Sequence, residues 1–150
     1  MSVSPIPDPP HAFWGEHRRP LDADGFLILP EHIPPATRFV LAKGLDGCLL
    51  LAPSAYFAAL QEKIRALPLT DKRSRTLRRH FYASATPVTP DSHNRIRIPE
   101  KLRAYAGLTE TVAIIGNDAY LEIWNTDAWD AMSREADRMI EEEGWQLEGI

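Results

Sequence analysis

Apolar residues occur along the chain in short groups that turn residues separate from one another. In residues 95–98, period-two alternation places two isoleucines on a core face and two arginines on the opposite face, as in a half-buried strand. Gly-x-Asp turns at 44–46 and 116–118 each separate two further short apolar segments. The pattern predicts a mainly β fold with helices, of the α+β class.

Three segments are predicted to be helices. The first is predicted to begin after Ser54 as its N-cap, with apolar positions at Phe57, Leu60, Ile64 and Leu67. The last is predicted to begin after Thr126, and its apolar stripe consists of Trp129, Met132, Ala136, Met139 and Ile140. Both stripes indicate core or interface surfaces. The third helix is expected within 68–85, the most basic segment, which contains Lys72, Arg73, Arg75, Arg78 and Arg79.

The chain contains an internal repeat. Residues 21–32 match residues 89–101 at a constant offset of 69, and residues 44–57 match residues 116–129 at an offset of 72. Both copies have the same order: a turn rich in Asp, Gly or Asn, a short strand, Pro-Glu, two further strands and a helix. This order predicts a duplication with pseudo-twofold symmetry.

The length of 150 residues fits one compact domain, so the two copies must share a core. We expect a flexible leader at 1–13, a first repeat at 14–66, a basic helix between the repeats at 67–81, a second repeat at 82–143 and a tail at 144–150. The single cysteine, Cys48, lies in an apolar run, which favours a buried thiol in a reducing compartment.

The net charge of −4 is unevenly distributed. Residues 126–150 contain eight acidic and two basic side chains, a balance of −6, whereas the other 125 residues contain 15 basic and 13 acidic side chains, a balance of +2. An acidic C-terminal segment therefore masks a mildly basic body. Nucleic acid remains a possible partner on this distribution.

Several classes of function find no support in the sequence. It has no apolar run of about 18 residues and no secretory signal, so we expect a cytoplasmic protein without a membrane partner. It has no GxSxG motif, P-loop, HExxH motif or paired-cysteine zinc spacing, and its five histidines are scattered. We therefore expect no catalysis, metal, cofactor or small-molecule substrate.

The turn before the second-copy strand contains the most specific candidate chemistry. Asp91 stands four positions ahead of Arg95 and is placed to hold its guanidinium by a salt bridge, with His93 and Asn94 between them. An oriented arginine can pair with O6 and N7 of guanine in the major groove, which a two-stranded ribbon is narrow enough to enter. Arg97 extends the same face. On the chemistry alone, an ordinary surface salt bridge is the commoner explanation.

The first copy differs at the same place. Asp22 is kept, but Phe26 and Ile28 occupy the positions of the two arginines. Phenylalanine cannot pair with the edge of guanine, and an exposed apolar pair marks a contact surface. We expect Phe13 and Trp14 of the leader, or a neighbouring subunit, to cover it.

Two further arginines lie near the start of the first copy. Arg18 and Arg19, beside His17, are candidates for phosphate contacts. A solvated basic strand end is the commoner explanation for such a group.

These motifs together resemble the MraZ family. The duplicated Asp-xxx-Arg turn followed by Ile-Pro-Glu, the phrase GLDGCLLLAPSAYF, the basic segment LPLTDKRSRTLRRHFYASA, and the later AYAGL, VAIIG and LEIWN segments follow the order of that family over residues 14 to about 143. The resemblance implies a duplicated, swapped-hairpin AbrB-like β-barrel.

The resemblance also implies a function. Members of the family are cytoplasmic, nucleoid-associated regulators that assemble into rings and bind tandem G-rich DNA repeats upstream of their own division and cell-wall gene cluster. Their DNA contacts come from the Asp-xxx-Arg turns, so Asp91 and Arg95 keep the pattern whereas Phe26 departs from it. The loss of one bidentate base contact costs roughly 1 to 3 kcal/mol per site, which a ring on several repeats would partly recover.

Two other hypotheses stay open. In the first, the chain is an assembly or protein-interaction module that has lost DNA binding, and the Phe26 and Ile28 face forms its interface. The second, an AbrB-like antitoxin, is weaker because such a protein normally has one hairpin module and a disordered tail.

Overall fold

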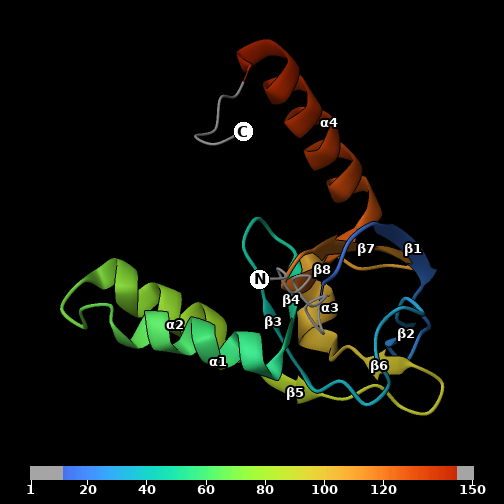
Figure 1. The fold of residues 1–150 in the computed structure, drawn as a ribbon, viewed down its shortest axis with the longest axis horizontal. Helices are drawn as coiled ribbons and strands as arrows, with labels where there is room; N and C mark the ends of the chain where they lie inside the picture. Colours follow the sequence, from blue (N-terminus) through green and yellow to red (C-terminus); the bar gives the residue numbers. More distant parts are fainter. Residues whose placement is uncertain (1–11, 145–150) are drawn as a thin grey trace, which may run out of the picture.

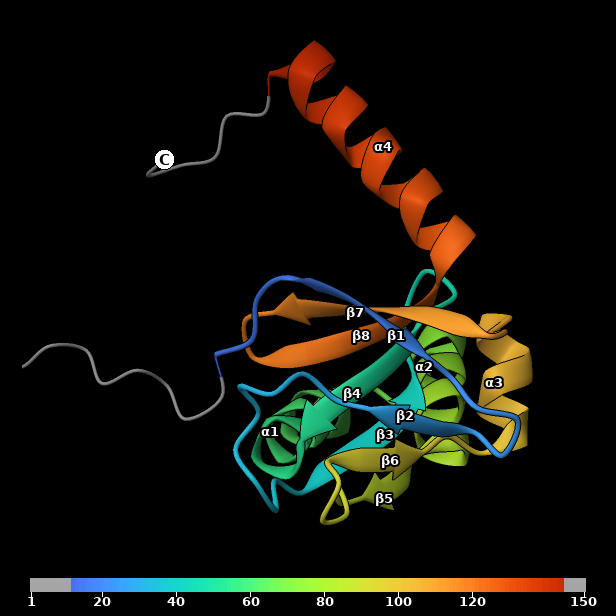
Figure 2. The same ribbon diagram turned by 90° about the vertical axis from the view of Figure 1, so that its right-hand side faces the viewer.

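A computed structural model describes residues 12–144 of the chain as a six-stranded antiparallel sheet with a separate two-stranded ribbon and four helices. Across the sheet the strands are β1 (Glu16–Pro20), β7 (Thr111–Asn117), β8 (Tyr120–Asn125), β4 (Leu49–Pro53), β3 (Phe39–Lys43) and β5 (Thr86–Val88). The ribbon, β2 (Phe26–Ile28) and β6 (Arg95–Arg97), lies across one face of this sheet (Figure 2).

The ribbon joins the two sequence copies. Phe26 stands opposite Arg97, Leu27 opposite Ile96, and Ile28 opposite Arg95. Leu27 and Ile96 are buried at the centre of the ribbon, as the alternation predicts for residue 96. The residues on either side of this pair face outward, so the ribbon has one apolar and one accessible face.

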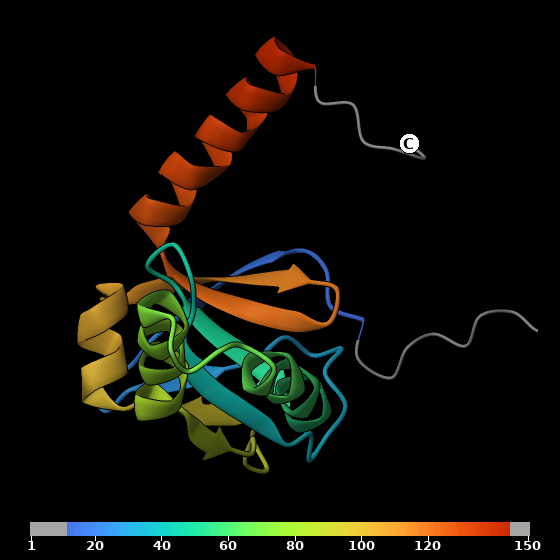
Figure 3. The ribbon, with the colours of Figure 1, turned by 90° about the vertical axis from the view of Figure 1, so that its left-hand side faces the viewer.

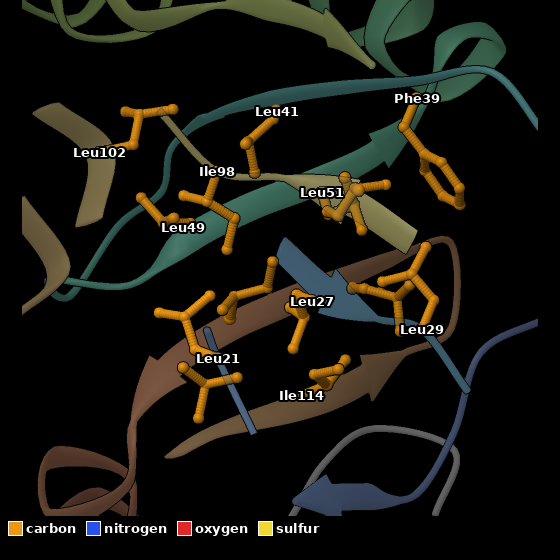
Figure 4. Close-up of a cluster of buried hydrophobic side chains, with 14 of the residues drawn as sticks. Leu21, Leu27, Leu29, Phe39, Leu41, Leu49, Leu51, Ile98, Leu102 and Ile114 are labelled. Carbon is orange, nitrogen blue, oxygen red and sulfur yellow. The ribbon is translucent and has the colours of Figure 1, made fainter. Parts of the chain in front are cut away.

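The main hydrophobic core fills the space between the ribbon and the sheet (Figure 4). The ribbon side supplies Leu27 and Ile96 with Leu29 and Ile98 just beyond them. The sheet side consists of alternate strand residues, namely Phe39, Leu41, Leu49, Leu51, Val112, Ile114, Leu121 and Ile123. Most of these side chains are almost fully buried, so the core fixes the ribbon in place.

The opposite face of the sheet is covered by α1 (Ser54–Arg65) and α2 (Lys72–Ser84) (Figures 1 and 3). Leu50 and Ala52 of β4 pack there against Phe57, Ile64 and Phe81. All five residues of β4 are buried, which explains the unbroken apolar run in this part of the sequence.

The two remaining helices lie at the edges of the molecule. α3 (Glu100–Ala106) follows the ribbon and ends at Gly107, whose φ of +62° suits a residue without a side chain. α4 (Thr126–Glu143) leaves the body after Trp129, which packs against Trp124. No residue of α4 is buried, and the helix projects from the sheet (Figure 1).

The helix starts differ by one residue from the sequence predictions. Pro53, not Ser54, is the N-cap of α1, and the Ser54 hydroxyl donates to the Arg38 carbonyl at 3.1 Å. Asn125, not Thr126, caps α4, because its side-chain oxygen accepts from the Ala128 N–H at 2.9 Å. A capping side chain needs a neighbour with the right geometry, which composition alone does not give.

The α+β class is confirmed, whereas the expected closed barrel is not found within residues 12–144. β1 and β5 are the open edges of the sheet, and β2 and β6 form a separate two-stranded sheet to which Leu21 adds one isolated bridge at Leu27. Most of the predicted leader and tail lies outside the described residues. In the described part of the leader, Phe13 is buried in the core and forms a bridge with Asp118.

Leu27 provides a test of the ribbon's role in stability. Leu27→Ala is expected to lower the free energy of unfolding by about 2–5 kcal/mol, because it leaves a cavity under the ribbon. Urea denaturation measures the change. The neighbouring Ile28→Ala is the control, since Ile28 is 47% exposed and its truncation should cost less than about 1 kcal/mol. Equal losses in the two variants would show that the ribbon is not anchored through Leu27.

Candidate nucleic-acid interface

The turn at 91–94 is organised by the carboxylate of Asp91. Its Oδ1 accepts the backbone N–H groups of His93 and Arg95, each at 2.9 Å, and its carbonyl accepts the Asn94 N–H at 2.9 Å. Asn94 takes a φ of +59°, a left-handed conformation that asparagine tolerates better than most residues. The turn thus presents Arg95 at the start of β6 with a fixed backbone.

The Arg95 side chain is held on two sides. Its Nε donates to Asp91 Oδ2 at 2.9 Å, and its guanidinium carbon lies 4.7 Å from the centre of the Phe26 ring. The carboxylate fixes one edge of the planar group and the aromatic ring covers one face. Within the described residues, neither terminal nitrogen of Arg95 donates to a protein acceptor. The outer fork of the guanidinium therefore remains available.

The same contacts set the charge state of Asp91. The backbone N–H of Arg95, then its side chain, and then the N–H of His93 lower the pKa of this carboxyl, and partial desolvation opposes them. The carboxylate thus stays ionised beside the guanidinium.

Arg97 is exposed at the other end of β6. Its Nε donates to the Asp24 carbonyl in the first-copy turn at 3.0 Å, and it stands opposite Phe26 in the ribbon. The two apolar side chains on the same face of the ribbon as the arginines are also accessible: Ile28 is 47% exposed and Phe26 is half-buried. One surface therefore combines two arginines with two apolar side chains.

The first-copy turn repeats the backbone geometry of the second. Asp22 Oδ1 accepts the N–H groups of Asp24 at 3.0 Å and Phe26 at 2.8 Å, and the Asp22 carbonyl accepts the Gly25 N–H at 3.0 Å. Gly25, with a φ of +92°, takes the place of Asn94. A side-chain carbon at Gly25 would lie 2.6 Å from the Ile98 carbonyl, so glycine is required there. The two copies differ in the side chain that the turn presents, not in the turn.

The two turns lie at opposite ends of the ribbon and each is tied to the other strand. The Leu29 N–H donates to the Asn94 carbonyl at 2.9 Å, and the Ile98 N–H donates to the Gly25 carbonyl at 2.8 Å. The Asn94 amide adds bonds to the carbonyls of Leu29 at 2.9 Å and Pro30 at 3.3 Å. The amide of Asn94 therefore faces the protein, whereas the His93 side chain is exposed.

The leader residues are placed differently from the expectation. Phe13 belongs to the main core, and Trp14 stacks on His32 with ring centres 6.2 Å apart. The Phe26 ring is instead covered by Arg95 of the other copy. Ile28 keeps 47% of its surface exposed.

Arg18 and Arg19 lie on β1, outside the ribbon. Arg18 bonds to Glu16 and Asp130, each at 2.6 Å, so two carboxylates neutralise it. Arg19 donates to the Arg18 carbonyl and lies 3.6 Å from Glu31. The structure thus brings Asp91, His93, Asn94, Arg95 and Arg97 together on one turn and strand, and it holds the β1 pair elsewhere by ion pairs.

Arg103 of α3 supports the site and was not singled out from the sequence. Its Nε donates to the Ile98 carbonyl at 2.9 Å and its Nη1 donates to the Ala23 carbonyl at 3.2 Å, so it joins α3 to the first-copy turn. Ile98 is near Arg103 in the sequence, but Ala23 is 80 residues away, so this second bond could not be predicted from local sequence. The contact between Arg95 and Phe26 was missed for the same reason, since it depends on the pairing of the two copies.

The arrangement suits recognition of a planar, hydrogen-bonding ligand edge. An ion-paired, stacked arginine loses little side-chain entropy when its fork binds two acceptors.

Residues 12–144 contain no group of three or more histidine, cysteine or acidic side chains that could hold a metal ion. Within the same residues, no helix is long and apolar enough to cross a membrane.

Cys48 is buried in a small apolar cluster with Ala113, Ile115 and Trp124. Burial, followed by the nearby Glu122 carboxylate, raises the pKa of its thiol. The Sγ atom donates to the Leu45 carbonyl at 3.0 Å. The thiol is therefore protonated and packed into the fold.

The Asp91–Arg95 pairing is testable by titration. Arg95→Gln is expected to move the pKa of Asp91 part of the way back to its ordinary value of 3.8, because the side-chain bond and charge are lost while the backbone donors remain. Since the folded-state pKa is depressed, the ionised carboxylate stabilises the turn above the ordinary pKa, and this stabilisation is lost as the pH falls through the folded-state pKa.

The carboxyl ¹³C chemical shift of Asp91 reports this titration. Arg97→Gln is the matched control and should leave the midpoint unchanged, because Arg97 bonds to Asp24 rather than to Asp91. An unaltered midpoint in Arg95→Gln would contradict the pairing.

Comparisons with known proteins identify the family. The family model described as "MraZ protein, putative antitoxin-like" matches residues 81–145. The chain is 40% identical to the transcriptional regulator MraZ of Acetivibrio thermocellus over 123 residues, which cover 81% of this chain and 86% of the relative. It is 39% identical to the transcriptional regulator MraZ of Pelotomaculum thermopropionicum over 132 residues, which cover 87% and 91% of the two chains. From this similarity over most of its length, together with the two Asp-organised turns, we conclude that the chain belongs to the MraZ family.

Proposed function

We propose that this protein is a sequence-specific DNA-binding transcriptional regulator that reads guanine through Arg95. The observation that carries the proposal is the geometry of this residue, which Asp91 holds at 2.9 Å and the Phe26 ring covers at 4.7 Å. The terminal nitrogens of the guanidinium remain available for O6 and N7 of guanine. The names of the relatives, transcriptional regulators, support the same conclusion.

The other residues of the turn have different roles in this proposal. Arg97 and His93 are exposed on either side of Arg95 and contact the DNA near the same base pairs. Asn94 supports binding through the backbone, since its amide ties the turn to Leu29 and Pro30. Asp91 orients Arg95 without itself touching a base.

Arg18 and Arg19 are proposed as secondary phosphate contacts. Arg18 must exchange its bonds with Glu16 and Asp130 for a phosphate, and exposed ion pairs of this kind are worth little. Replacing these ion pairs by a phosphate contact therefore costs little free energy, and it adds little to the affinity for DNA. The main contribution to affinity comes from the ribbon.

The two copies are proposed to be related by a duplication with a pseudo-twofold axis through the Leu27–Ile96 pair, in a swapped-hairpin arrangement. The matching hydrogen bonds of the turns at Asp22 and Asp91 support this relation. The Leu29–Asn94 and Ile98–Gly25 hydrogen bonds join equivalent positions of the two copies, so the same axis relates them. We accordingly propose repeats at 14–66 and 82–143, joined by the segment 67–81, which contains most of the basic helix α2.

The target is proposed to be tandem G-rich repeats in the promoter of the division and cell-wall gene cluster, bound by a homo-oligomeric ring in the cytoplasm at the nucleoid. Each subunit would read through one arginine turn, because Phe26 occupies the other reading position. A ring places several Arg95 side chains on consecutive repeats. The high effective concentration of the later contacts offsets the weakness of each one.

A second candidate function is favoured by the exposed Ile28, which is 47% accessible beside a half-buried Phe26. In this case the ribbon face is a protein interface, and the protein assembles without binding DNA. Salt-dependent binding of a promoter duplex would decide against it, since neutralisation of phosphates by arginine gives a steep dependence on salt.

Arg95→Ala is expected to lower the affinity for a promoter duplex with G-rich repeats by roughly tenfold to a hundredfold per site, the effect of losing one bidentate base contact. Gel shift at fixed salt measures this change. Arg95→Lys keeps the charge but lacks the planar fork, so it should lose nearly as much affinity for the repeats while it retains binding to random duplex.

The control for a lost positive charge is Lys101→Ala on α3, which should bind normally because Lys101 lies outside the ribbon. If Arg95→Ala bound the repeats as tightly as the unmodified protein, the role assigned to Arg95 would be wrong.

Phe26 is expected to act through Arg95. Phe26→Ala should lower the affinity roughly two- to fivefold, in line with an exposed cation–π contact. Phe26→Trp should retain binding, because it preserves an aromatic face. A double-mutant cycle separates an indirect from a direct role: in the Arg95→Ala background, the effect of Phe26→Ala should disappear. Additive losses would show that Phe26 touches DNA itself.

A further inference from the structure

Helices α2 and α4 carry opposite charges of equal size. The 13 residues of α2 contain five basic side chains and no acidic one, a balance of +5. The 18 residues of α4 contain seven acidic and two basic side chains, a balance of −5. Helix α2 packs on the sheet whereas α4 projects from the body (Figures 1 and 3), which separates the charges within one molecule.

The cationic side chains of α2 have no acidic partner among the described residues. Within the described residues, none of its five cations forms an ion pair with a carboxylate. Arg75 and Arg78 donate instead to backbone carbonyls at Leu69 and Ile64. Lys72 and Arg73 are exposed at the start of the helix.

An apolar hollow of about 350 Å³ runs beside these cations. It is lined by Leu45, Leu77, Thr76 and His80, together with Lys72 and Arg73. Leu45 is 59% exposed although it belongs to a tight turn between two buried strands. The hollow therefore combines a mainly apolar lining with two cationic side chains.

The helix α4 has the complementary surface. Its apolar stripe contains Met132 and Ile140, which are 39% and 59% exposed, and no residue of the helix is buried. Asp137 and Glu141 lie one turn apart beside the stripe, and within the described residues neither forms an ion pair. Arg138 is already held by Glu135 and Glu142 on the same helix. Along one side of the stripe, the anionic charge is thus uncompensated.

We propose that α4 of one copy docks on the hollow beside α2 of a second copy, with its apolar stripe on Leu45 and Leu77 and its acidic flank on Lys72 and Arg73. A contact between two α4 helices would oppose −5 to −5, whereas α4 on α2 opposes −5 to +5. The contact is head-to-tail, so each copy has one surface of each kind left for a further copy, and repetition closes a ring or extends a filament. This inference rests on the self-association in the proposed function, but not on DNA binding.

Charge reversal in the full-length protein tests the contact. Lys72→Glu/Arg73→Glu and Asp137→Lys/Glu141→Lys are each expected to lower the assembled mass in light scattering and to raise the dissociation constant of the assembly at least about tenfold. Ile140→Asp should act in the same direction through the apolar stripe. All these side chains are exposed, or on the surface of the helix, and circular dichroism verifies that the variants fold.

The decisive arm is rescue. The two charge-reversed variants mixed together, or the four substitutions combined in one chain, should recover the assembled mass, because each reversed helix then meets an oppositely charged partner. Lys101→Glu, a reversal on α3, is the control and should leave the mass unchanged. Unaltered mass in the single-helix variants, or the absence of rescue, would overturn the proposal.

Binding of a duplex with a single site separates this inference from the proposed function. If the charge-reversed variants lose assembly but bind the single site within about twofold of the unmodified protein, the docking contact is supported. If Lys72→Glu/Arg73→Glu keeps its mass but binds DNA more weakly, α2 is a phosphate-contact surface and the docking contact is overturned. If unmodified protein assembles but binds no duplex, the proposed function fails and the docking contact stands.

Discussion

The pairing of β2 with β6 is the constraint on which the rest of the structure depends. Each strand has only three residues, and a ribbon of this size is not stable alone in water. Its stability comes from Leu27 and Ile96, which are buried against the six-stranded sheet. Because the strands come from different copies, the pairing also joins the two halves into one core. A change that separated the strands would therefore expose the core and dismantle the candidate site together.

The same pairing explains why the substitution at position 26 is compatible with the fold. Asp22 and Asp91 build turns with the same hydrogen bonds, and these bonds involve the backbone N–H of residue 26 or 95 rather than its side chain. The side chain at either position is thus free to change. In the antiparallel register, Phe26 lies diagonal to Arg95, and the ring covers the guanidinium. The residue at position 26 thus packs on the arginine that the other copy presents at the equivalent position.

Local patterns in the sequence predicted the features that depend on neighbours along the chain. The alternation around Ile96, the Asp91 turn and the basic helix are of this kind, and so is the α+β class. The cross-copy contacts of Arg95 and Arg103 could not be predicted, because they depend on a strand register that links residues about 70 to 80 positions apart. The predicted start of α1 was wrong by one residue because the Ser54 hydroxyl donates to the Arg38 carbonyl, which only the folded chain brings near.

Net charge is a poor guide to the partner of this protein, and the structure gives the physical reason. The chain carries −4 overall, yet α4 alone contributes −5. Charges in water are screened within about 8–10 Å at physiological salt, so a helix that projects from the sheet has little influence on a ribbon at the other side of the body (Figure 1). The potential at Arg95 and Arg97 is set by their near neighbours, and among residues 12–144 Asp91 is the only carboxylate that forms an ion pair with either. An acidic protein can therefore present a cationic surface, provided that its acidic residues lie far from that surface.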